Sequence, residues 1–135
     1  MLRNNLARFN SADDSTKRTA VHEAGHAVQA RRAGATEVRA WVNFGTVRRA
    51  GTCSWKSSSK ISPFQRLLVC AAGAAAELAV FGSMSKDESV YAGDIRNAKR
   101  HGWDSDQFFD AVYGLAETID IDAIMAQEIT TRHYS

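Results

Sequence analysis

Residues 62–82 read SPFQRLLVCAAGAAAELAVFG and predict a long helix that is buried on most of its sides. Ser62 is a favourable N-cap, Pro63 suits the first helical position, and Gln65 stands where a capping box requires it. Gly82 predicts the end of the helix. Between these ends only three residues are polar: Gln65, Arg66 and Glu77. Gly73 and the alanines around it should allow another element to approach closely.

The chain before this segment predicts one more long helix and a β-hairpin. Residues 16–33 should be helical, because several good N-caps precede them and Gly34 follows. Residues 37–44 alternate between apolar and polar side chains, as in a half-buried strand, and residues 50–56 would complete the hairpin. The polar run SWKSSSK, residues 54–60, predicts a mobile surface loop.

Helices are expected for most of the remaining chain. After a polar loop at residues 83–90, a helix should begin near Ala92 and stop at Gly102, and further helices with one apolar face follow. Apolar residues at helical spacing near the N-terminus indicate a short arm or a loosely held end. We therefore predict an N-terminal arm, residues 1–15, and one α+β domain, residues 16–135, that is mainly α-helical with a small β-hairpin or sheet.

Composition narrows the classes of function. The 17 basic and 15 acidic residues nearly cancel, and the arginines are scattered, which disfavours a nucleic-acid partner. Cys53 and Cys70 form no C-x-x-C pair, so neither a disulfide framework nor a thiolate metal cage is expected. The longest apolar run, residues 67–76, is half of a membrane span, and the N-terminus lacks a signal-peptide pattern. A soluble, cytoplasmic protein is the expectation.

The segment TAVHEAGHAVQA, residues 19–30, holds the strongest chemical signal. Residues four apart lie on the same side of a helix, so His22 and His26 can present two imidazole nitrogens to one metal ion. A catalytic zinc site needs three protein ligands and leaves one position for water. Glu23 follows the first histidine and can take a proton from that water. The pattern predicts a zinc peptidase.

An alternative to the metal site is two solvated histidines that happen to be four residues apart. On a helical projection Val21, Ala24 and Val28 cluster on one side, and the two histidines fall nearly opposite. Ordinary core histidines are therefore not expected. The HExxH spacing together with the downstream motifs favours the metal.

The sequence resembles the FtsH family of ATP-dependent zinc metalloproteases in three motifs that occur in the same order. TAVHEAGHAVQA is similar to the zinc-binding helix of that family, TAYHEAGHA. Residues 72–82, AGAAAELAVFG, resemble its AGRAAEELIFG helix, and residues 92–98, AGDIRNA, resemble its SNDLERA segment. The resemblance implies an FtsH-type, zincin-like peptidase domain with one zinc ion per chain and with Asp94 as the third zinc ligand.

Several features depart from the family. Ala74 and Leu78 replace an arginine and a glutamate, which puts any contact made by those residues in doubt. The ATPase and transmembrane parts of FtsH proteins have no counterpart, and the C-terminal third matches only as generic helix. The resemblance implies hexameric rings for the parent family, so a homo-oligomer is a possibility. A separate ATPase or unfoldase is a second possible partner.

Spacing alone leaves three candidates for the third ligand. Asp94 opens a helix, where a carboxylate is also a good cap, and the resemblance decides in its favour. Glu77 lies in an apolar helix and needs a partner. It would either accept a hydrogen bond from a metal-bound histidine or form a salt bridge or cap elsewhere. His101 is expected to be a surface histidine.

A substrate strand is expected beside the metal. Zinc peptidases commonly hold an extended peptide against an exposed strand edge, because main-chain hydrogen bonds suit any sequence. Residues 50–54 occupy the place of the short strand in the family, so Gly51, Thr52 and Cys53 are nominated as that edge. A plain hairpin strand is the alternative.

The function expected from the sequence is zinc-dependent endopeptidase activity on unfolded or flexible polypeptides, with His22, His26 and Asp94 as metal ligands and Glu23 as general base. One alternative is a regulatory or adaptor protein that keeps the zinc and binds peptides or FtsH-like assemblies without cutting them. The intact Glu23 argues against it. A DNA-linked accessory protein of a mobile element is the other alternative, and the near-neutral charge disfavours it.

Overall fold

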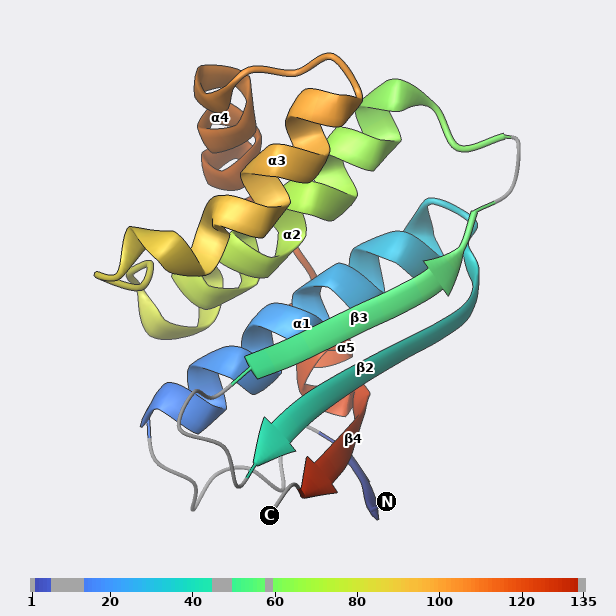
Figure 1. Ribbon diagram of the computed structural model, residues 1–135, viewed down its shortest axis with the longest axis vertical. Coiled ribbons are helices and arrows are strands. Elements are labelled where there is room, and N and C mark those ends of the chain that lie inside the picture. The colour runs from blue at the N-terminus through green and yellow to red at the C-terminus, as the bar shows by residue number, and fades with distance from the viewer. Residues whose placement is uncertain (1, 6–13, 45–49, 58–59, 134–135) are drawn as a thin grey trace.

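The computed structural model describes residues 2–5, 14–44, 50–57 and 60–133 (Figure 1). Helices and strands follow one another along the chain in the order β1 (Leu2–Asn5), α1 (Asp14–Arg32), β2 (Thr36–Phe44), β3 (Ala50–Lys56), α2 (Pro63–Phe81), a 3₁₀ turn η2 (Glu88–Tyr91), α3 (Ala92–Arg100), α4 (Ser105–Ala116), α5 (Ile121–Ala126) and β4 (Glu128–His133). The predicted class is confirmed: the fold is α+β and mostly helical, with one small sheet.

The sheet has four strands in the order β1-β4-β2-β3. β2 and β3 form the predicted antiparallel hairpin, in which Trp41 pairs with Thr52 and Val42 pairs with Gly51. β4 pairs with β2 in parallel and with β1 antiparallel. β3 is therefore one edge of the sheet.

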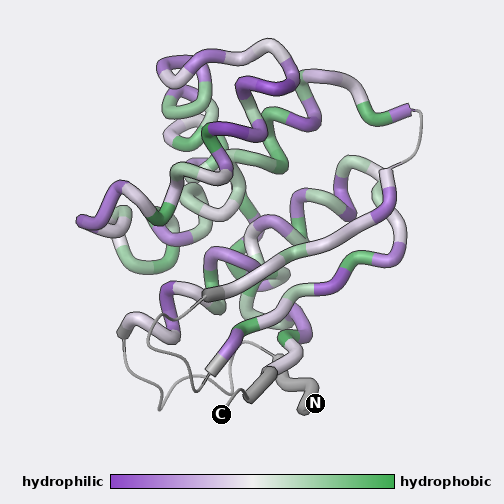
Figure 2. The backbone as a smooth tube through the Cα atoms, in the orientation of Figure 1, coloured by the Kyte–Doolittle hydropathy of each residue, from purple (hydrophilic) through white to green (hydrophobic). Residues whose placement is uncertain are grey.

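Helix α1 lies between the sheet and α2, which makes it the centre of the fold (Figure 1). Every residue from 20 to 30 is buried. The apolar residues of α1 and the small residues of α2 belong to the same core cluster. Figure 2 shows apolar residues along most of α2. Both faces of α1 are covered, so the polar residues of HEAGH are also inside the protein.

Helix α2 has the ends that the sequence predicts. The Ser62 side chain accepts a hydrogen bond from the Gln65 backbone N–H, and the Gln65 side chain accepts one from the Ser62 backbone N–H. Gly82 closes the helix with a φ of 77°. The predicted close approach is also present. A Cβ placed on Gly25 of α1 would lie 2.4 Å from the Ala72 carbonyl oxygen, so only glycine fits at this crossing.

Helix α2 also bears on the membrane prediction. Although its uninterrupted apolar run is short, the helix as a whole is long and apolar enough to cross a membrane by length and composition. Half of its most apolar window is buried inside the protein, and the core helix of a soluble protein meets the same criteria.

Three predictions about secondary structure are wrong. Within the predicted N-terminal arm, residues 1–15, Leu2–Asn5 forms strand β1 despite the helical spacing of its apolar residues, and Asp14 and Ser15 already belong to α1; residues 1 and 6–13 lie outside the described residues. For residues 54–56 the predicted strand is confirmed and the predicted loop is wrong, because Ser54, Trp55 and Lys56 belong to β3. Glu128–His133 forms β4, where only helix was expected. Strands β1 and β4 are each stabilised by a partner more than 80 residues away, and local patterns carry no sign of such pairing.

Candidate metal centre

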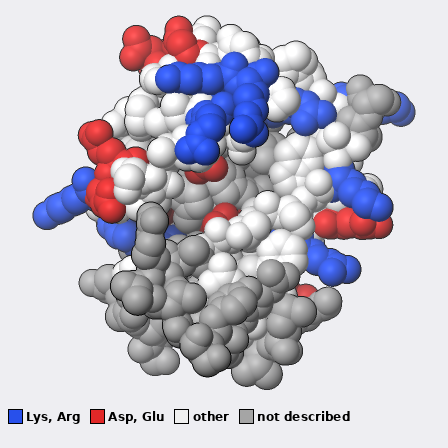
Figure 3. Space-filling model, in the orientation of Figure 1, with Lys and Arg blue, Asp and Glu red and all other residues white. Residues whose placement is uncertain are grey.

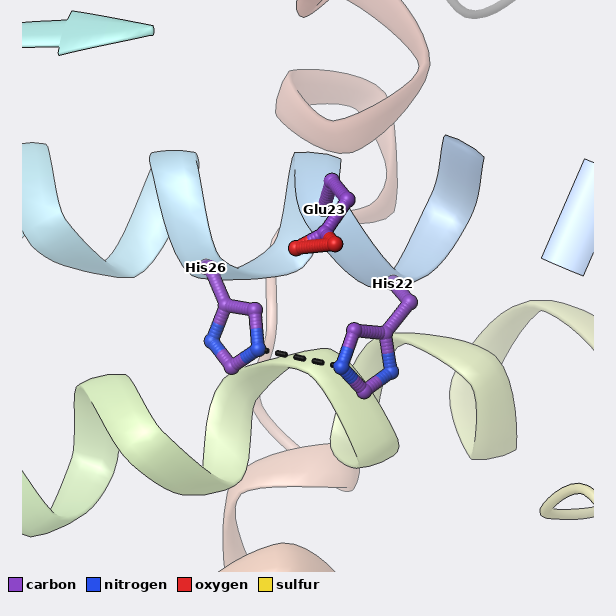
Figure 4. A group of neighbouring side chains, drawn as sticks. All are labelled: His22, Glu23 and His26. Carbon is purple, nitrogen blue, oxygen red and sulfur yellow. Dashed lines mark hydrogen bonds between the residues drawn. The ribbon is translucent and has the colours of Figure 1, made fainter. Parts of the chain in front are cut away.

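His22 and His26 lie one helical turn apart on α1, and both imidazoles point toward α2 (Figure 4). Their exposed fractions are only 8% and 7%, so the alternative of two solvated histidines does not hold. The two Nε2 atoms are 3.1 Å apart. The helical projection placed these rings correctly opposite the apolar cluster, but that side of α1 is covered by α2.

Asp94 brings a carboxylate to the same point from the first turn of α3. Its Oδ2 atom lies 2.9 Å from Nε2 of His22 and 3.2 Å from Nε2 of His26. The three candidate ligand atoms therefore form a nearly equilateral triangle. Asp94 is 72 residues from His22 in sequence, so only the packing of α3 against α2 brings them together.

The other ring nitrogens of the two histidines fix the tautomers. Nδ1 of His26 lies 2.6 Å from the Val69 carbonyl oxygen, and Nδ1 of His22 lies 2.8 Å from Oε2 of Glu77. A carbonyl or carboxylate oxygen can only accept, so each Nδ1 donates its proton. Each Nε2 then presents a lone pair toward the other and toward the Asp94 carboxylate. Three electron-rich atoms at these distances require a shared cation, either a proton or a metal ion.

The pKa values of these groups show the same competition for a cation. Burial by itself lowers the pKa of His22, but hydrogen bonds with Asp94 and Glu77 outweigh it and raise the pKa to about 10. Burial also lowers the pKa of His26, but the charge and the hydrogen bond of Asp94, together with the charge of Glu23, outweigh it and raise the pKa. Burial raises the pKa of Asp94, but the two histidines reverse this and hold it well below its usual range.

The geometry and chemistry of the donors fit a metal ion. Ligands at about 2.0–2.1 Å from a tetrahedral zinc ion stand about 3.3–3.4 Å apart, only a few tenths of an ångström more than the edges found here. Gly73 of α2 leaves the room: a Cβ at this position would lie 2.5 Å from Nε2 of His22 and 2.6 Å from Nε2 of His26. The buried group of His22, Glu23 and His26 could hold a metal ion.

Glu23 stands beside the histidines on the side of α1 that faces β3. One of its carboxylate oxygens and one ring nitrogen of each histidine all lie within 4.8 Å of one another. The backbone of β3 comes so close at Gly51 that a Cβ there would lie 2.7 Å from Oε2 of Glu23. Burial raises the pKa of Glu23, against the opposing effect of the two histidines. A carboxyl group with a raised pKa is suited to exchange protons near neutral pH.

The space-filling view shows that this face of the molecule is hollowed (Figure 3). Acidic side chains are visible inside the hollow, and basic side chains of α3 gather above it. On α3 the exposed basic residues are Arg96, Lys99 and Arg100.

The remaining candidates from the sequence occupy different places. His101 is exposed at the end of α3 and is no part of the histidine–aspartate triangle. Cys53 and Cys70 are free thiols whose burial raises their pKa values to about 12 and about 11, so neither offers a thiolate near neutral pH. Thr52 is exposed on β3, and Gly51 and Cys53 are half-buried.

Glu77 meets both alternatives that the sequence left open. It accepts a hydrogen bond from His22, and its Oε1 atom forms a salt bridge with Arg18 at 3.3 Å. Neither the part of Arg18 nor the closeness of Gly73 to both imidazoles is predicted from the sequence. The spacing of four between Arg18 and His22 puts them on one side of α1 and was the available signal.

Comparison with known proteins adds no relative, since no family model, no curated protein and no solved structure matches this chain.

Proposed function

We propose that this protein is a zinc-dependent endopeptidase of the kind that its resemblance to FtsH peptidase domains implies. One observation carries the proposal: Nε2 of His22, Nε2 of His26 and Oδ2 of Asp94 meet within 3.2 Å of one another, next to the carboxylate of Glu23. Two imidazoles and one carboxylate form a three-ligand set that leaves a coordination position open. A purely structural site has no use for a base beside an open position.

Each residue has a distinct part in the proposed reaction. His22, His26 and Asp94 would hold the ion, which supplies Lewis-acid polarisation of the scissile carbonyl and acidification of water. Glu23 takes the proton from the attacking water and later delivers it to the leaving amine. The burial that raises the pKa of Glu23 lets it hold that proton between the two steps.

Strand β3 is the proposed docking edge for the substrate. It is the outermost strand, and among the described residues it pairs only with β2. An extended peptide could add to its free side through main-chain hydrogen bonds. Gly51 in this strand touches Glu23, so a peptide on Gly51, Thr52 and Cys53 would lie beside the proposed base. Unfolded chains or flexible loops are the expected substrates, delivered with or without a separate unfoldase.

The test combines metal analysis with cleavage of casein or a quenched fluorescent peptide. The variants are Glu23→Gln and, as a matched control, Glu117→Gln, which makes the same chemical change at an exposed position after α4. We expect zinc in all three proteins and cleavage by the wild type and the control alone. Zinc in all three with cleavage by none would favour the adaptor alternative, and the absence of bound metal would refute both.

A further inference from the structure

A single carboxylate, Glu77, joins the metal centre to the far end of α2. Its exposed fraction is 1%, and the rest of the middle of α2 consists of small apolar residues. A buried carboxylate needs compensating partners, since an isolated one would cost several kcal/mol or take up a proton. Oε2 faces Nδ1 of His22 at 2.8 Å, and Oε1 faces a guanidinium nitrogen of Arg18 at 3.3 Å. Arg18 therefore supplies the positive charge on the side away from the histidine.

Arg18 is itself held in place by the end of α2. One guanidinium nitrogen donates to the Ser83 carbonyl oxygen at 3.0 Å, and the other donates to Oγ of Ser83 at 2.9 Å. The guanidinium lies 4.7 Å from the centre of the Phe81 ring. A cation in this place is also favoured by the carboxyl end of the helix. These contacts fix one guanidinium orientation, in which the fork faces Glu77 and Ser83 together.

We propose that Arg18 is a positioning residue for the metal ligand His22 and acts through Glu77. Held by Arg18, the Glu77 carboxylate stays aimed at Nδ1 of His22, which keeps the proton on Nδ1 and turns the Nε2 lone pair toward the ion. Carboxylate partners of this kind orient a histidine ligand and raise its basicity. The inference rests on the metal site of the proposed function but not on peptide hydrolysis.

The experiment is a double-mutant cycle with zinc affinity as the readout, measured by competition with a chromophoric chelator. Arg18→Gln should lower the zinc affinity about 10-fold, and Glu77→Gln should lower it about 10–100-fold. The double variant should bind zinc as Glu77→Gln does, because the effect of Arg18 passes through Glu77. Arg32→Gln removes the same charge from an exposed position on α1 and should leave the affinity unchanged.

Two further measurements separate positioning from general loss of stability. The visible absorption of the Co²⁺-substituted protein reports ligand geometry and should change in Arg18→Gln but not in Arg32→Gln. Arg18→Lys keeps the charge without the forked contact to Ser83, so its zinc affinity should lie between those of Arg18→Gln and the wild type. If Arg18→Gln or Glu77→Gln does not fold, Arg18→Lys and Ser83→Ala replace them, and each should bind zinc measurably more weakly than the wild type.

Three results would overturn the inference. The first is that Arg18→Gln has the zinc affinity and the cobalt spectrum of the wild type, or that Arg18→Lys and Ser83→Ala both do when they replace it. The second is a double variant whose loss is the product of the two single losses. The third is a wild-type protein without metal, which would remove the proposed function as well. A wild-type protein that binds zinc but cleaves no peptide would refute only the peptidase, and the cycle could still be measured.

Discussion

At the scale of the residue, Gly73 controls whether the two imidazoles can reach an ion. Gly73→Ala would place a Cβ 2.5–2.6 Å from ring atoms of His22 and from Nε2 of His26, so the rings must move apart. We expect the zinc affinity, measured by chelator competition, to fall by at least about 10-fold.

Gly114→Ala is the matched control, because a Cβ at this position on α4 meets nothing within 4 Å. It should bind zinc normally and gain about 0.5–1 kcal/mol of helix stability. A wild-type zinc affinity in Gly73→Ala would contradict the placement of the ion between these rings.

Gly51 leaves room for the Glu23 side chain, as Gly73 does for the two imidazoles. In Gly51→Ala the added Cβ would lie 2.6 Å from Cγ of Glu23 and 2.8 Å from Cγ2 of Thr19, so the Glu23 carboxylate must shift. If Glu23 is the base, a shift of about 1 Å should lower kcat about 100-fold. Zinc content should stay at the wild-type level, because the three atoms nearest to the added Cβ belong to Glu23 and Thr19 and not to a histidine. Loss of zinc together with activity would mean that β3 supports the metal site itself.

At the scale of the element, the capping box at the start of α2 is a local source of stability. Ser62→Ala removes the side chain that accepts from the Gln65 backbone and should lower the free energy of unfolding by about 1 kcal/mol. Urea denaturation should show a lower midpoint with an unchanged slope. Zinc affinity should not change, since Val69, Gly73 and Glu77 lie further along the helix. A changed slope would indicate that the start of α2 unfolds separately.

The packing of α1 explains how the histidines of the proposed metal site come to be buried on this helix. The sheet covers one side of α1 and α2 covers the other, so HEAGH is buried although its sequence is not uniformly apolar. Glycines at the two contact points, Gly25 and Gly73, let the helices come close enough for His22 and His26 to reach across to α3. This close approach gives the site its small size.

At the scale of the whole molecule, the proposed metal site joins α1 to α2 and α3, which begin more than 30 residues after α1 ends. A ligand that binds only the folded state stabilises it, by about 4 kcal/mol when free zinc is 1,000 times its Kd. We therefore expect removal of metal by EDTA to lower Tm by about 10 °C or more. Differential scanning fluorimetry with and without added zinc measures the shift. His26→Ala should show no zinc-dependent change in Tm, and an equal change in that variant would place the zinc elsewhere.

Local sequence patterns were sufficient to predict most of the helices and the β2–β3 hairpin. The bounds of α2 and of β3 follow from caps, turn residues and alternation, which act between residues a few positions apart. HEAGH on one turn of a helix also follows from spacing alone. The place of Asp94 beside the histidines does not follow from spacing, which left three candidates for the third ligand. Only the resemblance to FtsH proteins favoured Asp94.

The sequence by itself determined the long helices, the β2–β3 hairpin and the placing of Glu23 beside two histidines one turn apart, since each depends on interactions between residues close in the sequence. Tertiary structure decided the rest. It placed β4 between β1 and β2, buried the histidines against Gly73, and brought Asp94, Glu77 and Arg18 to the same centre. The contacts of Asp94 and Glu77 with His22, and of Arg18 with Glu77, join residues 55 to 72 positions apart, so they exist only after the apolar faces of α1 and α2 have packed together.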